Sequence, residues 1–279
     1  MDRRTFLRRT VTGGAALGVV GVTGMALAQG GVRITRHDLP PSLAPLLAPG
    51  RKLRIAQLTD IHVGWGTSAE TLRTAQVQAN LVRPDLLVLT GDYLNHSLAE
   101  IDTLRAWLRG LPRPCVATLG NHDHWSGALA IRRLLEQEGI PVLSNSSTVL
   151  HVAGQPLRIV GVDDGFTHRD DVDAAFRDVP RPQEALVLSH DPKTADRIAQ
   201  TGARIVLSGH THGGQFDIPG LTAALATVAG IHYLKGWYVI GGPSPDVNCR
   251  LYVNCGVGSS VTAGRNGATA SELAVFDVG

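Results

Sequence analysis

The sequence predicts an α/β fold whose strands are largely buried. From Arg51 onward, short apolar runs bounded by turn residues alternate with stretches whose apolar residues recur at helical spacing. This alternation is typical of strands that are separated by helices in one domain. The C-terminal third instead holds short apolar runs divided by glycine-rich breaks, so we expect a second, more antiparallel sheet there.

The expected elements follow in order along the chain. Six apolar runs are too short for helices and are expected to be strands: Leu53–Leu58, Leu86–Leu89, Cys115–Leu119, Leu157–Val162, Ala185–Leu188 and Ile205–Leu207. Four stretches carry helical spacing: Ala69–Leu81, Ala99–Leu108, Ala128–Glu138 and Thr194–Ala199. Val149–Val162 is expected to form a hairpin that turns near Gly154. The C-terminal strands are expected at Tyr238–Ile240, Leu251–Asn254 and Leu273–Phe276.

Residues 1–28 resemble a twin-arginine translocation signal. They hold Arg3 and Arg4, an apolar stretch rich in Gly, Ala and Val, and a small-residue cleavage site that ends at Ala28. We therefore expect export by the twin-arginine translocase, to the periplasm or to the outer face of the cytoplasmic membrane. Because its glycines make the stretch a poor permanent span, we expect cleavage rather than an uncleaved anchor.

The remaining chain is expected to hold one domain. Residues 29–50 are rich in proline and lack periodicity, so they are interpreted as a linker or as an extended segment lying on the domain. Residues 51–279 are long enough for one large domain, which we expect to be a monomer. Beyond residue 28 the chain has 22 basic and 23 acidic residues, which does not favour a nucleic-acid-binding surface.

The three cysteines do not form a disulfide framework. Cys115 lies in an apolar run and is expected in the core. Cys249 and Cys255 can pair in an oxidising compartment, but we expect free buried thiols.

Five of the apolar runs end in Asp, Asn or His. The side chains concerned are Asp60, His62, Asp92, Asn121, His122, Asp123, His190, Asp191, His210 and His212. In open α/β sheets the ligand site forms at the carboxyl ends of strands, so these groups are expected to converge. Alternate side chains of an extended chain point the same way, which would let Asp60 and His62, and likewise His210 and His212, face one cavity.

These residue types suit a metal site. Imidazoles, carboxylates and a carboxamide favour divalent transition-metal ions such as Mn, Zn, Fe or Co. Glycines 91, 120, 209, 213 and 214 allow tight turns and leave room for a metal or a phosphate near the backbone. Seven candidate ligands exceed what one structural zinc needs, and their number suits two metals that share a carboxylate.

The motifs DIH, GD, GNHD, SH and GHTHGG, in this order, resemble those of the calcineurin-like metallophosphoesterases. The leader and the late segment LYVNCGVGSS resemble the bacterial exported branch of that family. The resemblance covers residues 51–279 and implies a four-layer α/β/β/α sandwich of two mixed sheets flanked by helices. It also implies that a hydroxide bridging two metals attacks phosphorus.

The resemblance implies a role for each motif residue. Asp60, His62 and His212 would hold one metal, Asn121, His190 and His210 the second, and Asp92 would bridge both. His122 would act on the leaving-group side, as a proton donor or charge stabiliser. Many relatives have a carboxylate three residues after the GD motif that orients this histidine, whereas this chain has Asn95 there, which weakens the case for a strong general acid.

Other polar and aromatic residues near the motifs have structural explanations. Asp191 before Pro192 is expected to be a helix N-cap, and Asp123 is expected to cap or orient a loop. Asp163 and Asp164 either lie at the cleft or form a satisfied loop pair. Trp65 and Trp125 either wall the cleft or pack. Arg265 is a speculative phosphate contact.

The expected function is that of a dinuclear metal-dependent phosphoesterase of the cell envelope. The resemblance favours a phosphodiester or pyrophosphate bond, in a small phosphorylated molecule or in a lipid or other envelope phosphodiester. Two alternatives remain: a phosphomonoesterase with the same site, and a scaffold of the same fold that has lost catalysis.

Overall fold

The fold is described from a computed structural model of the chain. The structure describes residues 31–40, 43, 52–215, 218, 221–260 and 269–279. The predicted leader and the predicted phosphate contact Arg265 lie outside these residues. Within them, no helix is both long enough and apolar enough to cross a bilayer.

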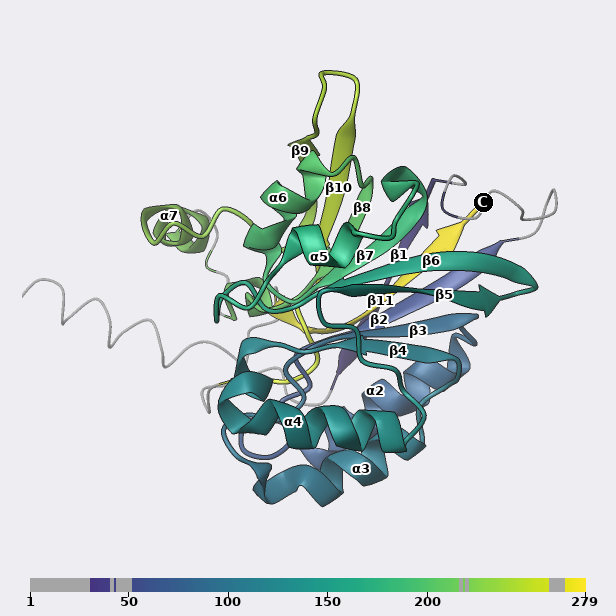
Figure 1. Cartoon of the computed structure of the whole chain (residues 1–279). Helices are drawn as coiled ribbons and strands as arrows, with labels where there is room; N and C mark the ends of the chain where they lie inside the picture. Colours follow the sequence, from purple (N-terminus) through teal and green to yellow (C-terminus); the bar gives the residue numbers. More distant parts are fainter. Residues whose placement is uncertain (1–30, 41–42, 44–51, 216–217, 219–220, 261–268) are drawn as a thin grey trace, which may run out of the picture.

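Two mixed sheets form the centre of the molecule (Figure 1). In the first, the strand order is β1 (Val32–Leu39), β11 (Ser271–Val278), β2 (Leu53–Leu58), β3 (Leu86–Thr90) and β4 (Cys115–Thr118). In the second, it is β5 (Ser146–Val152), β6 (Gln155–Val162), β7 (Ala185–Ser189), β8 (Ile205–Ser208), β10 (Asn248–Val253) and β9 (Gly236–Gly241). Strands β2, β3 and β4 run parallel to one another, as do β6, β7 and β8.

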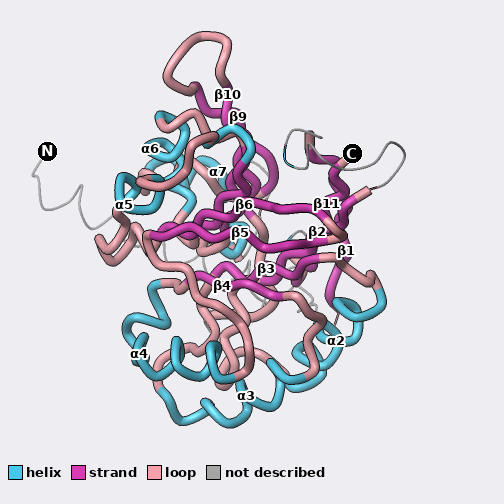
Figure 2. Tube along the Cα trace, turned by 45° about the vertical axis from the view of Figure 1, so that its right-hand side comes forward, coloured by secondary structure: helices cyan, strands magenta, loops and turns pink. Residues whose placement is uncertain are grey.

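Helices cover the outer face of each sheet, which gives the four layers that the family resemblance implies (Figure 2). The first sheet is covered by α2 (Ala69–Leu81), α3 (Ile101–Arg109) and α4 (Asn121–Gln137), and the second by α5 (Val172–Phe176) and α6 (Ala195–Gln200). A further helix, α7 (Leu221–Val228), lies outside both sheets. The two sheets pack face to face through a third apolar core.

The buried strands explain why continuous apolar runs predicted them. In β3, Leu87 and Leu89 face the helices of the first sheet, whereas Leu86 and Val88 face the second sheet. A strand that is covered on both faces has no polar side, so its sequence is apolar throughout. The predicted hairpin is also confirmed, because β5 and β6 pair antiparallel around Ala153 and Gly154.

Two details differ from the prediction. The C-terminal strands do not form a sheet of their own: β9 and β10 extend the second sheet, whereas β11 lies within the first. Residues 29–50 were interpreted either as a linker or as an extended segment lying on the domain. The second interpretation is correct for β1, which pairs in parallel with β11 along eight residues. A linker is therefore wrong for Val32–Leu39, because this segment is an edge strand of the domain.

All three cysteines are free and buried, as predicted. Cys115 lies in the core of the first sheet. Burial raises the pKa of Cys115 and of Cys249 to about 12, so both are inert thiols.

Candidate metal centre

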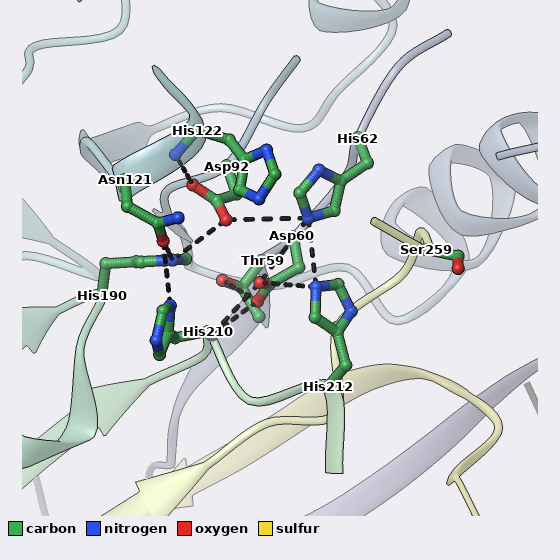
Figure 3. Close-up of polar contacts among 12 residues, drawn as sticks. Thr59, Asp60, His62, Asp92, Asn121, His122, His190, His210, His212 and Ser259 are labelled. Carbon is green, nitrogen blue, oxygen red and sulfur yellow. Dashed lines mark hydrogen bonds and ion pairs between the residues drawn. The ribbon is translucent and has the colours of Figure 1, made fainter. Parts of the chain in front are cut away.

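The carboxyl ends of five strands from both sheets meet in one place. The loops after β2 and β3 run side by side, since Asp60 N–H donates to the carbonyl oxygen of Gly91 at 2.9 Å and His62 N–H to that of Asp92 at 3.0 Å. The loops after β7 and β8 are joined in the same way, by Gly209 N–H and the carbonyl oxygen of His190 at 3.1 Å. The predicted residues from both sheets therefore face a common centre (Figure 3).

The backbone at this centre is left-handed rather than extended. Asp60, His62, Asp92, His210 and His212 have φ values of 51°, 47°, 57°, 74° and 52°. Such values are uncommon outside glycine and cluster at functional sites. The side chains converge as predicted, but the predicted reason, alternation along an extended chain, is wrong: the chain turns at each of these five positions instead.

One group of side chains consists of Asp60, His62 and His212, all buried. Nε2 of His62 lies 3.1 Å from Nε2 of His212, and Nε2 of His212 lies 3.4 Å from Oδ1 of Asp60. Two imidazole nitrogens at this separation match the spacing of two ligands that each lie about 2 Å from one zinc-like ion.

A second group consists of Asn121, His190 and His210. Oδ1 of Asn121 lies 2.9 Å from Nδ1 of His210 and 3.2 Å from Nε2 of His190. Nδ1 of His190 donates to the carbonyl oxygen of Thr90 at 2.7 Å, which directs Nε2 toward the centre.

Asp92 lies between the two groups. Its Oδ2 is 3.6 Å from Nε2 of His62 and 3.1 Å from Nε2 of His190, so one carboxylate oxygen contacts a histidine of each group. Its Oδ1 accepts from the backbone N–H of His122 at 2.9 Å. The seven side chains expected as ligands thus form two adjacent sets around a shared carboxylate, and all of them are buried except the half-buried His210.

The electrostatics of the site favour a bound cation. Burial alone would raise the pKa of Asp92, but the neighbouring His190 and His62 lower it well below its usual range. Burial alone would lower the pKa of His190, but Asp92 and Asp60 raise it well above 6.5. In the absence of metal, a proton on His190 balances the buried carboxylate, and a cation that binds there would displace it.

Glycines keep the centre open, as the motifs predicted. A Cβ atom on Gly209 would lie 2.3 Å from Oδ2 of Asp60, and one on Gly120 would lie 2.3 Å from Oδ1 of Asp92. A third glycine, Gly256, follows β10 with a φ of 77°, and a Cβ there would lie 2.6 Å from that of Asp60. Gly256 was not predicted as part of the site, although it lies within the LYVNCGVGSS segment.

His122 borders the Asp60 group and is oriented by backbone. Its Nδ1 donates to the carbonyl oxygen of Asn95, while the Asn95 amide donates to the carbonyl oxygen of Trp65 at 2.7 Å. His122 belongs to a cluster with His62 and Asp92, whose candidate ligand atoms all lie within 4.8 Å of one another. Asn95, three residues after Asp92, therefore orients the histidine through its main chain.

Four other carboxylates near the motifs have structural partners. Asp123 accepts from the backbone N–H groups of Asp92, Tyr93 and Gly120 at 2.8 to 2.9 Å, and so fixes the loop after β3. Asp191 accepts from Lys193 N–H as the predicted N-cap.

Asp163 and Asp164 form a hydrogen-bonded loop pair. Asp163 contacts His124 at 2.7 Å and also accepts from Ser144, and Asp164 accepts from Thr167.

One residue that contributes to the site was not predicted. It is Thr59, whose hydroxyl donates to Oδ2 of Asp60 at 2.8 Å. A threonine directly before the first motif gives no distinctive sequence signal.

Comparison with known proteins agrees with this geometry. The family profile described as calcineurin-like phosphoesterase matches residues 53–214, more than half of the chain. The uncharacterized metallophosphoesterase YkuE of Bacillus subtilis is 30% identical over 271 residues, which cover 92% of this chain and 91% of YkuE. The UDP-2,3-diacylglucosamine pyrophosphatase LpxG of Chlamydia trachomatis is 26% identical over 286 residues, which cover 81% of this chain and 84% of LpxG.

A solved structure supports the fold. The NAD nucleotidase NadN of Haemophilus influenzae superposes with a TM-score of 0.50 and 17% identity, over 75% of this chain and 46% of that one. Its likeness concerns the architecture of two mixed sheets flanked by helices. The clusters of histidine and aspartate side chains are consistent with the dinuclear metal site typical of that family. On both profile and sequence identity, the chain belongs to the calcineurin-like phosphoesterase family.

Proposed function

We propose that this protein is a dinuclear metal-dependent phosphoesterase that hydrolyses phosphodiester or pyrophosphate bonds in the cell envelope. The observation that carries the proposal is the position of Asp92. Its Oδ2 contacts a histidine from the loop after β2 and another from the loop after β7. A buried carboxylate that is shared by two imidazole groups suits two neighbouring cations.

The residues fit two divalent transition-metal ions, of which Mn, Zn, Fe and Co suit the donor set. In this proposal, Asp60, His62 and His212 would hold one ion, Asn121, His190 and His210 would hold the other, and Asp92 would be shared between them. When bound, the ions supply Lewis-acid activation of water and neutralise charge on the phosphoryl oxygens. The protein fixes the ligands through left-handed backbone and through outer contacts such as that of Thr59.

His122 acts on the leaving-group side. Its Nδ1 is held by the carbonyl oxygen of Asn95, so the other ring nitrogen is available to hold a proton for the departing oxygen. A carbonyl stabilises an imidazolium less than a carboxylate does. We therefore assign His122 to hydrogen bonding and charge stabilisation at the leaving oxygen, with proton transfer greatest for poor leaving groups.

Two observations support a bond with a substituent on each side of the phosphate. A pocket of about 510 Å³ extends from His210 and His212, which leaves room for a second group beside the reacting phosphate. The relative LpxG is named as a pyrophosphatase. The envelope location is supported by the twin-arginine pattern of residues 1–28.

The first test combines metal content with hydrolysis. The protein purified with Mn or Zn is expected to bind about two metals per chain and to hydrolyse bis(p-nitrophenyl) phosphate faster than p-nitrophenyl phosphate. Chelation should abolish both reactions, and Asp92→Asn should lose metal and activity together because the shared carboxylate is gone.

Each alternative has its own outcome in this test. A faster rate with the mono-aryl ester would identify a phosphomonoesterase with the same site. A folded protein that binds no metal and hydrolyses neither ester under any added ion would be a scaffold. A rate that survives chelation would overturn the metal mechanism.

A further inference from the structure

Exposed apolar side chains gather at the mouth of the metal centre. The structure describes fourteen large hydrophobic side chains as exposed, among them Phe166 and Ile231, which line the pocket that extends from His210 and His212. They include every exposed aromatic side chain among the described residues: Trp65, Trp125 and Phe166, which are 65%, 55% and 52% exposed. Both tryptophan side chains are more than half exposed, so neither is packed in the interior of the domain.

Ring contacts join two of these side chains to residues of the site. The ring of Trp125 lies 4.9 Å from that of His122 and 6.0 Å from that of Phe166. The ring of Phe166 lies 5.0 Å from that of His210. The backbone carbonyl oxygen of Trp65 accepts the hydrogen bond from the Asn95 amide, and the carbonyl oxygen of Asn95 holds His122.

The pocket continues this apolar surface toward α7. It is lined by Phe166, His210 and His212 at the metal end and by Ile231 and Leu234 at the other. Ile231 N–H donates to the carbonyl oxygen of Ala226 at 2.8 Å, so the pocket wall continues directly from α7.

The helix α7 presents apolar residues to solvent. Of its eight residues only Ala226 is buried, whereas Leu225 and Val228 are 58% and 87% exposed. Residues 221–231 include no charged residue. Figure 1 shows α7 at one end of the molecule, outside both sheets. An uncharged helix that exposes leucine and valine leaves an apolar surface for which water is a poor solvent.

We propose that this apolar rim, formed by Trp65, Trp125, Phe166, Leu225, Val228 and Ile231, docks the metal centre on a lipid bilayer. The substrate is then a phosphoester of a membrane lipid, whose apolar chain lies along the pocket while its phosphate reaches the metals. This inference rests on the proposed function and adds the substrate class. Tryptophans and leucines around a polar site are suited to the bilayer interface.

The position of the rim favours a bilayer over a second copy of the chain. A protein seated on Trp125, Phe166 and α7 would cover the pocket that leads to His210 and His212, and so would close the site to substrate. A bilayer supplies the substrate through the same contact. Lys193 also lines the pocket, where its ammonium group suits the phosphate of a lipid headgroup.

The test uses the full chain and vesicles of phosphatidylcholine and phosphatidylglycerol with brominated acyl chains. Bromine quenches a tryptophan only on contact, so the signal reports the rim even when the apolar leader also binds the vesicle. Vesicles should quench the fluorescence of the wild type, and the pair Trp65→Phe and Trp125→Phe should lose most of this quenching. The buried Trp107 and the half-buried Trp237 should not contribute.

A second pair of variants tests α7. Leu225→Ser with Val228→Ser should weaken the vesicle affinity read from quenching at least about ten-fold, because two apolar side chains lose their burial. Leu81→Ser, on α2 and 72% exposed, is the matched control and should bind like the wild type.

Hydrolysis then separates docking from chemistry. In the same vesicles, the wild type should prefer dodecyl p-nitrophenyl phosphate to methyl p-nitrophenyl phosphate. The α7 variant should lose this preference at least about ten-fold while keeping its rate on the methyl ester.

Several outcomes would overturn the inference: no quenching of the wild type, quenching that is unchanged in the α7 variant, or a dimer without vesicles that the α7 variant dissociates. Quenching as expected without hydrolysis of either ester would support docking and overturn the proposed function together with the lipid substrate.

Discussion

Five of the proposed ligands lie on left-handed backbone, and glycines supply the space that this conformation needs. A left-handed non-glycine residue costs about 1–3 kcal/mol, so the strain at Asp60 or His210 must be held by the surrounding contacts. Those contacts are tight: His210 N–H donates to both oxygens of Asp60 at 3.0 and 3.1 Å. Such strain makes the site sensitive to small additions of volume.

Gly209→Ala tests this sensitivity. The new methyl group would lie 2.3 Å from Oδ2 of Asp60 and from Oγ1 of Thr59, so the carboxylate must move. We expect loss of at least one metal and a fall in hydrolysis of bis(p-nitrophenyl) phosphate by at least about 100-fold. Gly241→Ala is the control, because its methyl group would meet no atom within 4 Å. A Gly209→Ala protein with full metal content and full activity would contradict the geometry.

His122 is expected to matter most when the leaving group is poor. His122→Asn removes the imidazole, while the metal ligands stay in place. General acid catalysis contributes about 100-fold or more, so hydrolysis of an alkyl ester should fall by about that factor and p-nitrophenyl esters should fall less. Rates across a series of leaving groups check this, with metal content as the control. Equal losses for all leaving groups would assign His122 to positioning.

At the scale of elements, the loop after β6 is held by Asp163. Burial alone would raise the pKa of Asp163, but hydrogen bonds from His124 and Ser144 lower it. The stabilisation is therefore present above the unfolded pKa of about 3.9 and is lost as the pH falls through the lowered folded pKa. This loop carries Phe166, so its stability also bears on the apolar rim.

Asp163→Asn should reveal this dependence. In urea unfolding of the metal-free protein near pH 7, the variant should be less stable than the wild type by about 1–3 kcal/mol. Once the pH has fallen below the lowered folded pKa of Asp163, the difference should disappear, because Asp163 is then protonated in both states. The exposed Asp246→Asn serves as a comparison and should change neither value by much. A difference that stays constant over this range would assign the effect to packing alone.

The elements also show what sequence can predict. Runs such as Leu86–Leu89 were recognised because burial on both faces removes every polar residue. The strand β1 has the sequence VRITRHDL and exposes its charged residues at the edge of the sheet. The strand conformation of β1 depends on pairing with β11, which is far away in the sequence. A local sequence pattern cannot predict this pairing. The helix α7 was not predicted because its apolar residues lie on all sides of the helix. Its sequence therefore lacks the helical spacing of apolar residues that a one-sided apolar face produces.

The residues of the candidate site were predicted more completely than their backbone conformation. Polar residues at five strand ends sufficed to bring the proposed ligands together, since chain topology directs those ends to one place. Their left-handed conformation and the carbonyl that orients His122 depend on backbone geometry, and residue types alone do not specify it.

At the scale of the whole molecule, the metal centre joins the two sheets. The loops after β2, β3 and β4 belong to the first sheet, and those after β7 and β8 belong to the second. Around the site, the contacts between the loops of the two sheets include His210 with Asp60 and Val257 N–H with the carbonyl oxygen of Thr59 at 3.0 Å. Metals that bind ligands from both sheets would therefore stabilise the folded chain as a unit.

Chelation is accordingly expected to lower the Tm. A ligand that binds only the folded state, at about 1,000 times its Kd, adds about 4 kcal/mol, and in a chain of this size each kcal/mol raises the Tm by roughly 2–4 °C. Removing the metals should thus lower the Tm by about 8 °C or more. Asp92→Asn should show a smaller shift, because its carboxylate contacts both groups, whereas Gly241→Ala should respond like the wild type. A Tm that is unchanged by chelation, in protein shown by elemental analysis to lose its metals, would mean that the ions act in chemistry without linking the sheets.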